Sequence, residues 1–224
     1  MKKLLPLLLL LSACATPQKV QQSGITPEGV QPEFVMIADF ESHPNCLGGD
    51  VGVYGDGEPD WSKANNPHSW YYDQKSPHFN PNNIFSGQQS FLLINGEKGL
   101  KNGWSSFSMN LGPTLNKETT PIEVQPLNVS SYQKLTFMVK GDKGGEKFNV
   151  IFRDSHAPDY IPQSRVTSLI AGAPKQWTKI EIPLSKFGWQ VDLKNLTNIG
   201  IEFGSNLGNK QGAGIFLDDF KFEK

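Results

Sequence analysis

Four carboxylates near the two ends of the sequence have the chemistry to bind a metal ion. Asp39 and Glu41 are two positions apart, so an extended strand there would place both on one face. Asp218 and Asp219 are adjacent and would point to opposite faces of a last strand. Calcium takes about six to eight hard oxygen ligands, so two carboxylates with loop carbonyls would suit it. Asp39, Glu41, Asp218 and Asp219 are therefore candidate calcium ligands. The alternative is that these acids are solvated strand ends.

Tryptophan and tyrosine residues offer a second kind of chemistry, because they fall in or beside segments rich in Asn, Asp, His and Gln. The apolar C–H faces of sugar rings stack on aromatic rings, while amides and carboxylates bond sugar hydroxyls. The aromatic residues concerned are Tyr54, Trp61, Trp70, Tyr71, Tyr72, Trp104 and Trp189. We predict glycan contacts from Trp61, Tyr72 and Trp104, with Asn65, Asn66 and Asp73 as polar partners. The alternative is that several of these aromatics belong to the core, as we expect of Trp177.

Catalytic patterns are weak in this sequence. The four histidines are scattered, without the HExxH spacing of a zinc enzyme, and there is no GxSxG nucleophile turn. Glu97 and Glu202 are a conceivable carboxylate pair for glycoside hydrolysis, but nothing in the sequence places them near each other. We therefore expect a binding protein rather than an enzyme, and no organic cofactor.

The charge balance argues against nucleic acid as a partner. The formal net charge is −1, and loss of Lys2 and Lys3 with a leader would make it −3 (19 − 22). Neutralising phosphates requires clustered Lys and Arg, which this chain does not have in surplus. Only 19% of residues are charged while 11% are aromatic, a composition typical of an all-β extracytoplasmic protein.

The N-terminus resembles a bacterial lipoprotein signal. Lys2 and Lys3 precede a short apolar run, which is too short to span a bilayer, and the run ends in the lipobox-like Leu11-Ser12-Ala13-Cys14. The resemblance implies a signal peptide over residues 1–13 and lipid, palmitate included, attached to Cys14. Residues 14–32 would form a flexible tether. Ala15 after the cysteine points to the outer membrane of the cell envelope, and Cys46 would remain as a free thiol. The alternative is an ordinary signal peptide.

Alternation of apolar and polar residues with a period of two recurs along the chain and predicts β-strands. It is clearest in residues 130–154, which we interpret as an antiparallel hairpin with a glycine turn at 141–145. Further strands are expected at 34–41, 52–54, 70–72, 87–95, 104–111, 165–170, 177–184, 199–203 and 214–222. We expect a long connection over 112–129 and one helical turn at 193–196. These elements predict a single all-β domain over residues 33–224, a two-sheet antiparallel β-sandwich.

Six segments, in order, resemble the galactose-binding-type jelly roll of many non-catalytic carbohydrate-binding modules. They are residues 37–41, 45–49, 86–91, 129–132, 177–184 and 215–220. The complex I intermediate-associated protein 30 family shares a similar sandwich and is the competing resemblance.

The resemblance implies a glycan or polysaccharide ligand. It also implies a structural calcium site where the two chain ends meet the Ser86-Gly87 turn, with Glu41 and one of Asp218 or Asp219 as principal ligands. With the lipid anchor, it implies attachment to the membrane of the cell envelope. The alternative is an assembly factor that docks an envelope protein through the same sandwich, because one fold can host several functions.

Overall fold

The computed structural model describes residues 32–41, 45–55, 71–73, 81–94, 104–116, 123–156 and 167–224. These residues form antiparallel strands and three short 3-10 helices, which are η1 (Pro81–Asn83), η3 (Leu184–Gln190) and η4 (Ser205–Leu207). None of the helices in the described part of the chain is long and apolar enough to cross a membrane. The all-β prediction is confirmed.

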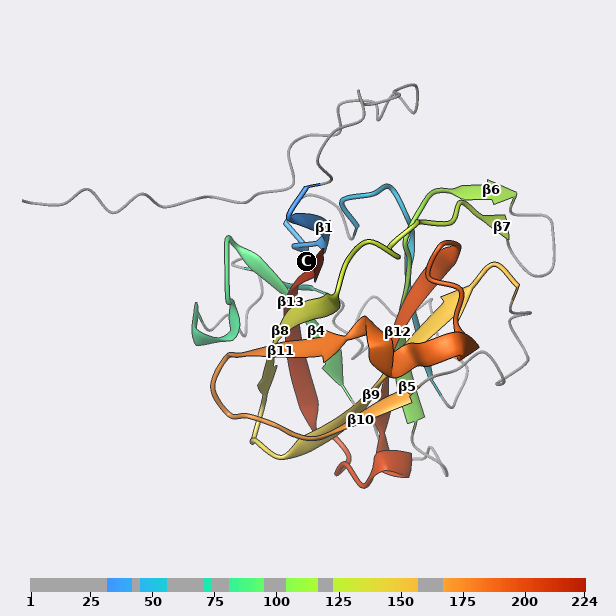
Figure 1. The fold of residues 1–224 in the computed structure, drawn as a ribbon. Helices are drawn as coiled ribbons and strands as arrows, with labels where there is room; N and C mark the ends of the chain where they lie inside the picture. Colours follow the sequence, from blue (N-terminus) through green and yellow to red (C-terminus); the bar gives the residue numbers. More distant parts are fainter. Residues whose placement is uncertain are drawn as a thin grey trace, which may run out of the picture.

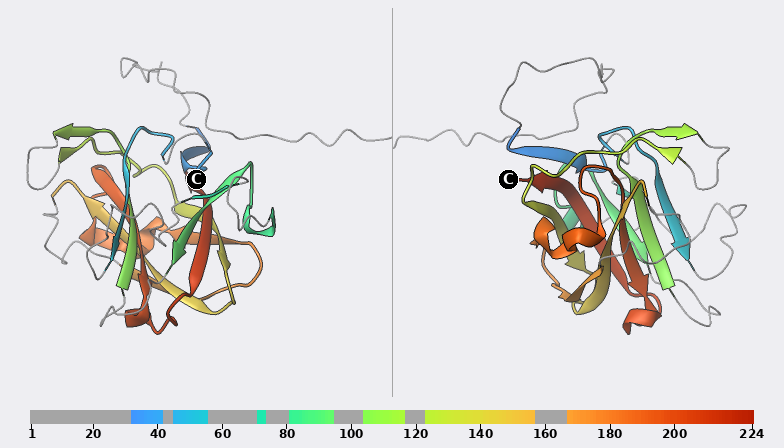
Figure 2. Two further views of the ribbon diagram at one scale, coloured as in Figure 1. Left: turned by 180° about the vertical axis from the view of Figure 1, so that it is seen from behind. Right: turned by 45° about the vertical axis from the view of Figure 1, so that its right-hand side comes forward.

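Two antiparallel sheets pack face to face (Figure 1; Figure 2). The six-stranded sheet has the order β11 (Thr178–Pro183), β8 (Lys134–Gly141), β13 (Gly214–Glu223), β4 (Gln89–Ile94) and β3 (Tyr71–Asp73), and β1 (Phe34–Ala38) also pairs with β13. The five-stranded sheet has the order β10 (Thr167–Ala173), β9 (Glu146–Asp154), β12 (Leu196–Gly204), β5 (Trp104–Asn110) and β2 (Val51–Gly55). This arrangement is the two-sheet sandwich that the sequence predicts.

The predicted hairpin over 130–154 is wrong in its pairing, although both of its strands exist. Strands β8 and β9 belong to different sheets, so the chain crosses from one sheet to the other at the glycine turn. Gly144 and Gly145 have φ of 84° and 97°, which explains why this crossing uses glycine. Phe137 on β8 faces Phe148 on β9 across the core, with ring centroids 6.1 Å apart. The alternating pattern gives each strand one buried face, but it does not say whether the two strands pair or face each other.

Three other segments differ from expectation. The strand expected over 34–41 ends at Ala38, because Phe40 takes a φ of 56° that no strand allows. The expected connection over 112–129 contains the two-stranded sheet of β6 (Thr114–Asn116) and β7 (Glu123–Val124). The helical turn lies at η3 rather than at 193–196.

The core between the sheets is built largely from phenylalanine. Phe107 of β5 is fully buried, with ring centroids 4.6 Å from Phe91 of β4 and 6.0 Å from Phe220 of β13. Phe152 of β9 stacks on Phe187 of η3 at 3.8 Å, so the helix closes one end of the core. Aromatic contacts of this kind therefore join elements of both sheets, and the alternate apolar residues of β5, β8 and β9 are buried.

Cys46 is disulfide-bonded rather than free, which corrects the expectation of a lone thiol. Its bonding partner lies outside the described residues. The sequence contains only two cysteines, so this bond bears directly on the predicted lipidation of Cys14.

Replacing Phe107 with Ala should lower the free energy of unfolding by about 3–5 kcal/mol, because it opens a cavity between three neighbouring rings. Denaturant unfolding of the purified domain would measure the change. Leu115→Ala is the matched control, since Leu115 is 56% exposed and its loss should cost less than about 0.5 kcal/mol. Equal losses in the two variants would contradict the proposed core.

Candidate functional site

The outer face of the five-stranded sheet carries a dense set of polar side chains. Along β12, Ile199, Ile201 and Phe203 are fully buried in the core, so Asn198 and Glu202 lie on the opposite face. The same alternation places Ser106, Ser108 and Asn110 of β5, and Asn149 and Arg153 of β9, on that face. We call these seven residues, Ser106, Ser108, Asn110, Asn149, Arg153, Asn198 and Glu202, the polar face.

Strand register places six of these residues in two rows that cross the sheet, and Ser108, opposite Gly200, lies between the rows. Glu202 pairs with Asn149 on one side and with Ser106 on the other. Asn198 likewise pairs with Arg153 and with Asn110. Four residues separate the two rows along β12, which is about 13 Å at the rise of an extended strand.

Glu202 is the acidic centre of the first row. Its Oε2 accepts a hydrogen bond from Nδ2 of Asn149 at 3.0 Å, and its Oε1 accepts one from Nδ2 of Asn206 at 2.8 Å. A carboxylate has about four lone-pair positions, so two neutral amides leave acceptor capacity for a ligand. The amide contacts also hold the carboxylate in one orientation.

Asn198 organises the second row by donating to both neighbours on β5. Its Nδ2 lies 2.8 Å from Oγ of Ser108 and 3.0 Å from Oδ1 of Asn110. Asn198 is only 7% exposed, whereas Ser108 and Asn110 are half-buried. The row therefore presents pre-positioned hydroxyl and amide groups, the kind that bond sugar hydroxyls.

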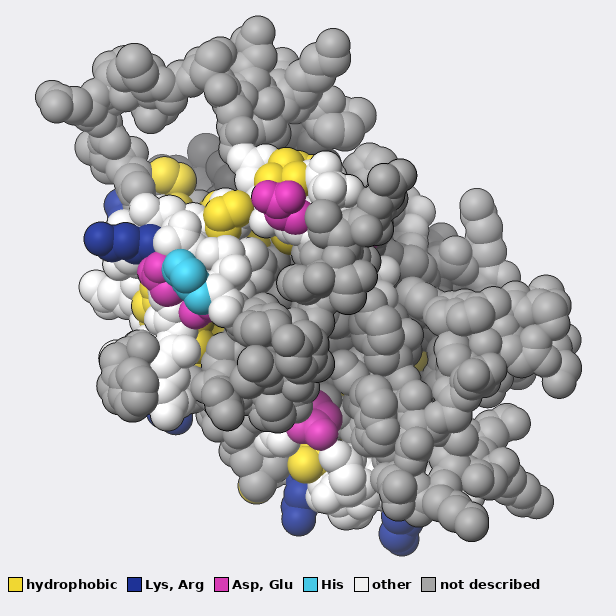
Figure 3. Space-filling view, turned by 90° about the vertical axis from the view of Figure 1, so that its right-hand side faces the viewer, with side chains coloured by type: hydrophobic (Ala, Val, Ile, Leu, Met, Phe, Trp, Pro, Cys, Tyr) yellow, Lys and Arg dark blue, Asp and Glu magenta, His cyan; other side chains and the backbone are white. Residues whose placement is uncertain are grey.

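A second polar cluster lies at the end of β9. Oδ1 and Oδ2 of the buried Asp154 accept hydrogen bonds from the backbone N–H groups of His156 and Asp192, at 2.9 and 2.7 Å. Nδ1 of His156 lies 3.7 Å from Asp154 and 4.0 Å from Asp192, and Figure 3 shows a histidine set against acidic side chains. Side-chain bonding by Asn195 is the main cause that holds the pKa of Asp192 below its usual value. We interpret this cluster as fastening the turn after β9 to the turn after η3.

Three of the four predicted metal-binding carboxylates, those of Glu41, Asp218 and Asp219, contact the turn at Ser86–Gln89. Both oxygens of Glu41 accept from the N–H of Gln88, at 2.9 and 3.0 Å. The carboxylate of Glu41 also occupies the space that a side chain at Gly87 would need. The strand that carries Glu41 in the prediction has already ended, so the turn at Phe40 aims this carboxylate.

Asp218 and Asp219 contact the same turn, which corrects the expectation that they point to opposite faces. Ser86 donates from its N–H to Oδ2 of Asp218 at 3.4 Å and from its Oγ to Oδ1 of Asp219 at 3.2 Å. The cause is a register shift in β13 between Asp218 and Lys221, where Asp219 takes a φ of 50°. A period of two does not reveal such a bulge.

Burial makes these carboxyl groups reluctant to ionise. Burial raises the pKa of Asp218 to about 8, against the hydrogen bond from Oγ of Ser90 at 2.8 Å. Burial also raises the pKa of Asp219, and the charge of nearby Asp39 adds to the effect. Among the described residues, no three His, Cys, Asp or Glu side chains are grouped to hold a metal ion by themselves. An ion here would need carbonyl or water oxygens as well.

The structure places the residues predicted to contact glycan in different parts of the molecule. Trp104 begins β5 in the five-stranded sheet, whereas Tyr72 and Asp73 lie on β3 at the edge of the other sheet. The structure describes the backbone but not the side chains of these three residues. Trp61, Asn65 and Asn66 lie outside the described residues, as does Glu97. These contacts stay predictions.

Sequence reasoning missed the polar face itself. Its asparagines and serines are common residue types, and they become a set only through the register of three strands distant in sequence. The available signal was the alternation of Ser and Asn with buried residues in β5.

Comparison with known proteins shows which proteins and which family this chain resembles. A search of curated proteins gives no match. Among solved structures, the chain is similar to the family 30 carbohydrate-binding module of a cellulosomal cellulase of Clostridium thermocellum. The identity is 18% and the TM-score 0.53, over 85% of this chain and 98% of that one. A family 11 carbohydrate-binding module from Clostridium thermocellum, in complex with a β-1,3-1,4-mixed-linked tetrasaccharide, has 14% identity and a TM-score of 0.49, over 85% and 95% of the two chains.

The similarity to the family 30 module concerns the fold alone, and the family model is more direct. Residues 50–224 match the model of carbohydrate binding domain 30, which spans both sheets from β2 to β13. Because this match covers more than half of the sequence, the chain belongs to the carbohydrate binding domain 30 family.

Proposed function

We propose that this protein binds a glycan without catalysis, and that the polar face of the five-stranded sheet is the binding surface. The observation that carries the proposal is the match of residues 50–224 to carbohydrate binding domain 30. The ligand would be a polysaccharide or oligosaccharide whose hydroxyls bond the amides, hydroxyls and carboxylate of the two rows.

The physical support is the pre-organisation of these groups. Asn149, Asn198 and Glu202 are already held by side-chain hydrogen bonds between neighbouring strands. A ligand that meets fixed partners loses less free energy to side-chain ordering than one that meets mobile partners. Trp104, on β5 of the same sheet, is our candidate for ring stacking.

A binding role fits the chemistry of this face better than hydrolysis does. Glycoside hydrolases use a pair of carboxyl groups that flank the scissile bond. Among the described outward residues of β5, β9 and β12, Glu202 is the sole carboxylate. Its neighbours are neutral amides, which orient it as an acceptor.

The alternative of a protein-docking surface has less support. The exposed large hydrophobic residues in the described part of the chain are Phe34, Phe85 and Leu115. They lie on three different elements, and single exposed apolar residues are ordinary on protein surfaces. An envelope protein partner is therefore our second proposal.

We also propose a structural calcium ion at the turn formed by residues 86–89. Glu41, Asp218 and Asp219 all direct carboxyl oxygens at this turn, and Asp39 lies beside them. Burial raises the pKa of Asp218, and a nearby cation would favour its charged form. A calcium ion would supply that charge and join the first strand, the turn and the last strand.

The third proposal concerns location in the cell envelope. The lipobox-like Leu11-Ser12-Ala13-Cys14 supports lipidation and anchoring at the outer membrane. Lipidation forms a thioether with the sulfur of Cys14, and the sequence has only one other cysteine, Cys46. A lipid on Cys14 and an intramolecular disulfide of Cys46 are therefore alternatives.

A panel of neutral and anionic polysaccharides should contain a ligand for the folded domain in residues 33–224. Asn149→Ala should weaken its binding by about tenfold, because it removes a contact and frees the Glu202 carboxylate. Titration calorimetry would measure both affinities. Lys179→Ala, on the outer face of the other sheet, is the control and should bind as the wild type does. A folded protein that binds nothing in the panel would move our preference to the protein partner.

Removing calcium with a chelator should lower the melting temperature by several degrees, since a ligand that binds only the folded state stabilises it. In calcium-free protein the pKa of Asp218 rises from 3.8 to about 8 on folding. Its contribution to stability is therefore present at acid pH and lost as the pH rises toward 8.

Asp218→Asn should remove the part of the pH dependence that Asp218 contributes and leave the part due to Asp219, and thermal melts from pH 4 to 8 would show the reduction. Glu181→Gln, an exposed acid of β11, should melt as the wild type does. A calcium-independent melt would count against the site.

Cys14→Ser should release the protein from membrane fractions, because the lipid would have no attachment point. Mass spectrometry of the wild type would show an acylated Cys14 if the anchor exists. An unmodified Cys14 joined to Cys46 would rule the anchor out.

A further inference from the structure

A side-chain amide continues the hydrogen-bond ladder of the five-stranded sheet past the end of the β9–β12 pair. The pairing of β9 with β12 ends at Phe148 and Phe203, and the residue before Phe148 is Lys147. Nδ2 of Asn209 donates to the carbonyl oxygen of Lys147, and Oδ1 of Asn209 accepts from its N–H, both at 2.7 Å. A neighbouring strand exchanges the same two bonds with its partner, so the amide of Asn209 stands in for a strand residue.

Asn209 belongs to the fold rather than to the open surface, because it is only 8% exposed. It ends the turn that contains η4, and two backbone bonds close this turn. The N–H of Gly208 donates to the carbonyl of Ser205 at 2.8 Å, and the N–H of Asn209 donates to the carbonyl of Gly204 at 3.2 Å. These bonds and the amide of Asn209 fasten residues 205–208, which we call the η4 turn, to the start of β9.

The η4 turn carries Asn206 to the polar face. Nδ2 of Asn206 donates to Oε1 of Glu202 at 2.8 Å, and Asn206 is exposed to solvent. In the described part of the chain, its side chain makes no other hydrogen bond. An amide has two donor hydrogens and a carbonyl acceptor, so one donor and the acceptor are available to a ligand. Asn206 therefore extends the first row beyond the end of β12.

From these contacts we propose that the polar face continues onto the η4 turn, where Asn206 is a further ligand contact. Asn209 is the positioning residue, because it acts on Asn206 by holding the turn against the backbone of Lys147. The proposal rests on the proposed function and goes further, since it adds a contact on a turn to a surface made of strands. The ligand group concerned is a sugar unit whose hydroxyls lie past Glu202.

Alanine substitutions at the two asparagines test the proposal. The probe is the polysaccharide of the panel that binds best, titrated below the melting temperature of every variant. Asn206→Ala should weaken binding by about tenfold, because its hydrogen bonds to the ligand are lost. Asn209→Ala should weaken binding nearly as much. The double variant should lose no more than about tenfold, whereas two independent contacts would multiply to about a hundredfold.

A purely structural role for Asn209 would give a different result. Asn209→Ala should lower the melting temperature, because the N–H and carbonyl of Lys147 lose their partner. Asn206→Ala, at an exposed position, should leave the melting temperature nearly unchanged. If Asn209 served stability alone, its variant would melt at a lower temperature but bind as the wild type does.

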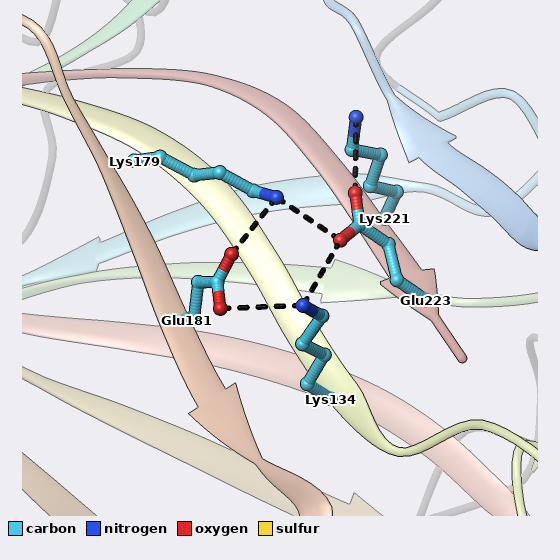
Figure 4. A network of polar contacts seen from close by, with 5 residues as sticks. All are labelled: Lys134, Lys179, Glu181, Lys221 and Glu223. Atoms are coloured by element: carbon cyan, nitrogen blue, oxygen red, sulfur yellow. Dashed lines mark hydrogen bonds and ion pairs between the residues drawn. The ribbon is translucent and has the colours of Figure 1, made fainter.

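The control variant is Lys134→Ala, on the outer face of the other sheet. It removes ion pairs to Glu181 at 3.2 Å and to Glu223 at 3.7 Å, so it perturbs a polar cluster away from the η4 turn. Its affinity for the polysaccharide should equal that of the wild type. The cluster is the five-residue ion-pair network of Lys134, Lys179, Glu181, Lys221 and Glu223 (Figure 4).

Nuclear magnetic resonance tests the contact itself. The side-chain amide signals of Asn206, assigned by their loss in Asn206→Ala, should shift when an oligosaccharide fragment of the same polysaccharide is added. The signals of Asn83, which bonds Lys140 of the six-stranded sheet, should stay in place. In Asn209→Ala the shift of the Asn206 signals should be lost, because the turn no longer holds the amide at the polar face.

The outcomes separate the two claims. If the polysaccharide binds but the Asn206 signals do not move, the proposal is overturned while the proposed function stands. Additive losses in the double variant, or an unchanged affinity in Asn209→Ala, overturn it as well. If the folded wild type binds no polysaccharide of the panel, the proposed function fails, and this proposal fails with it.

Discussion

The packing of phenylalanine rings between the two sheets is the constraint on which the rest of the molecule depends. Each strand must turn one face toward this aromatic layer, so every second residue is committed to the core. The residues in between are free to be polar, and the register of the strands then decides which of them become neighbours. The rows of Asn149 with Glu202, and of Asn198 with Asn110, follow from that arrangement.

At the carboxyl groups near the chain ends, polar side chains are buried, whereas on the polar face they lie on the outside of the sheet. Asp218 is fully buried, although ionised carboxylates are costly in the protein interior. Several donors, from Ser90, Ser86 and the N–H of Asp219, surround it. These hydrogen bonds offset only part of the cost of burial, which is why its pKa remains high. A bound cation would lower the free-energy cost of ionising the buried carboxyl group of Asp218.

Much of the fold could be predicted from the sequence, because alternation marks each strand and its buried face. Phe107, Phe137 and Phe148 illustrate this, since their inward orientation follows from the period of two alone. The pairing of β8 and β9 could not be predicted in the same way. A buried face is equally compatible with a neighbour in the same sheet and with one in the opposite sheet.

The candidate sites also have one part that could be predicted from the sequence and one part that could not. A family resemblance could anticipate that carboxyl groups meet at one turn, namely those of Glu41, Asp218 and Asp219. Their geometry could not be anticipated, because it depends on a bulge in β13 and on the left-handed backbone conformation of Phe40. The polar face could not be anticipated, because Ser108, Asn149 and Glu202 become adjacent only through long-range register.

The position of β13 has a consequence for how the protein is made. This strand is the last in the sequence, yet it pairs with β1, β4 and β8 near the middle of its sheet. During synthesis, the earlier strands leave the ribosome before the strand that joins them exists. The six-stranded sheet therefore cannot close until β13 has been synthesised, so the edges of β4 and β8 need protection from pairing with other chains until then.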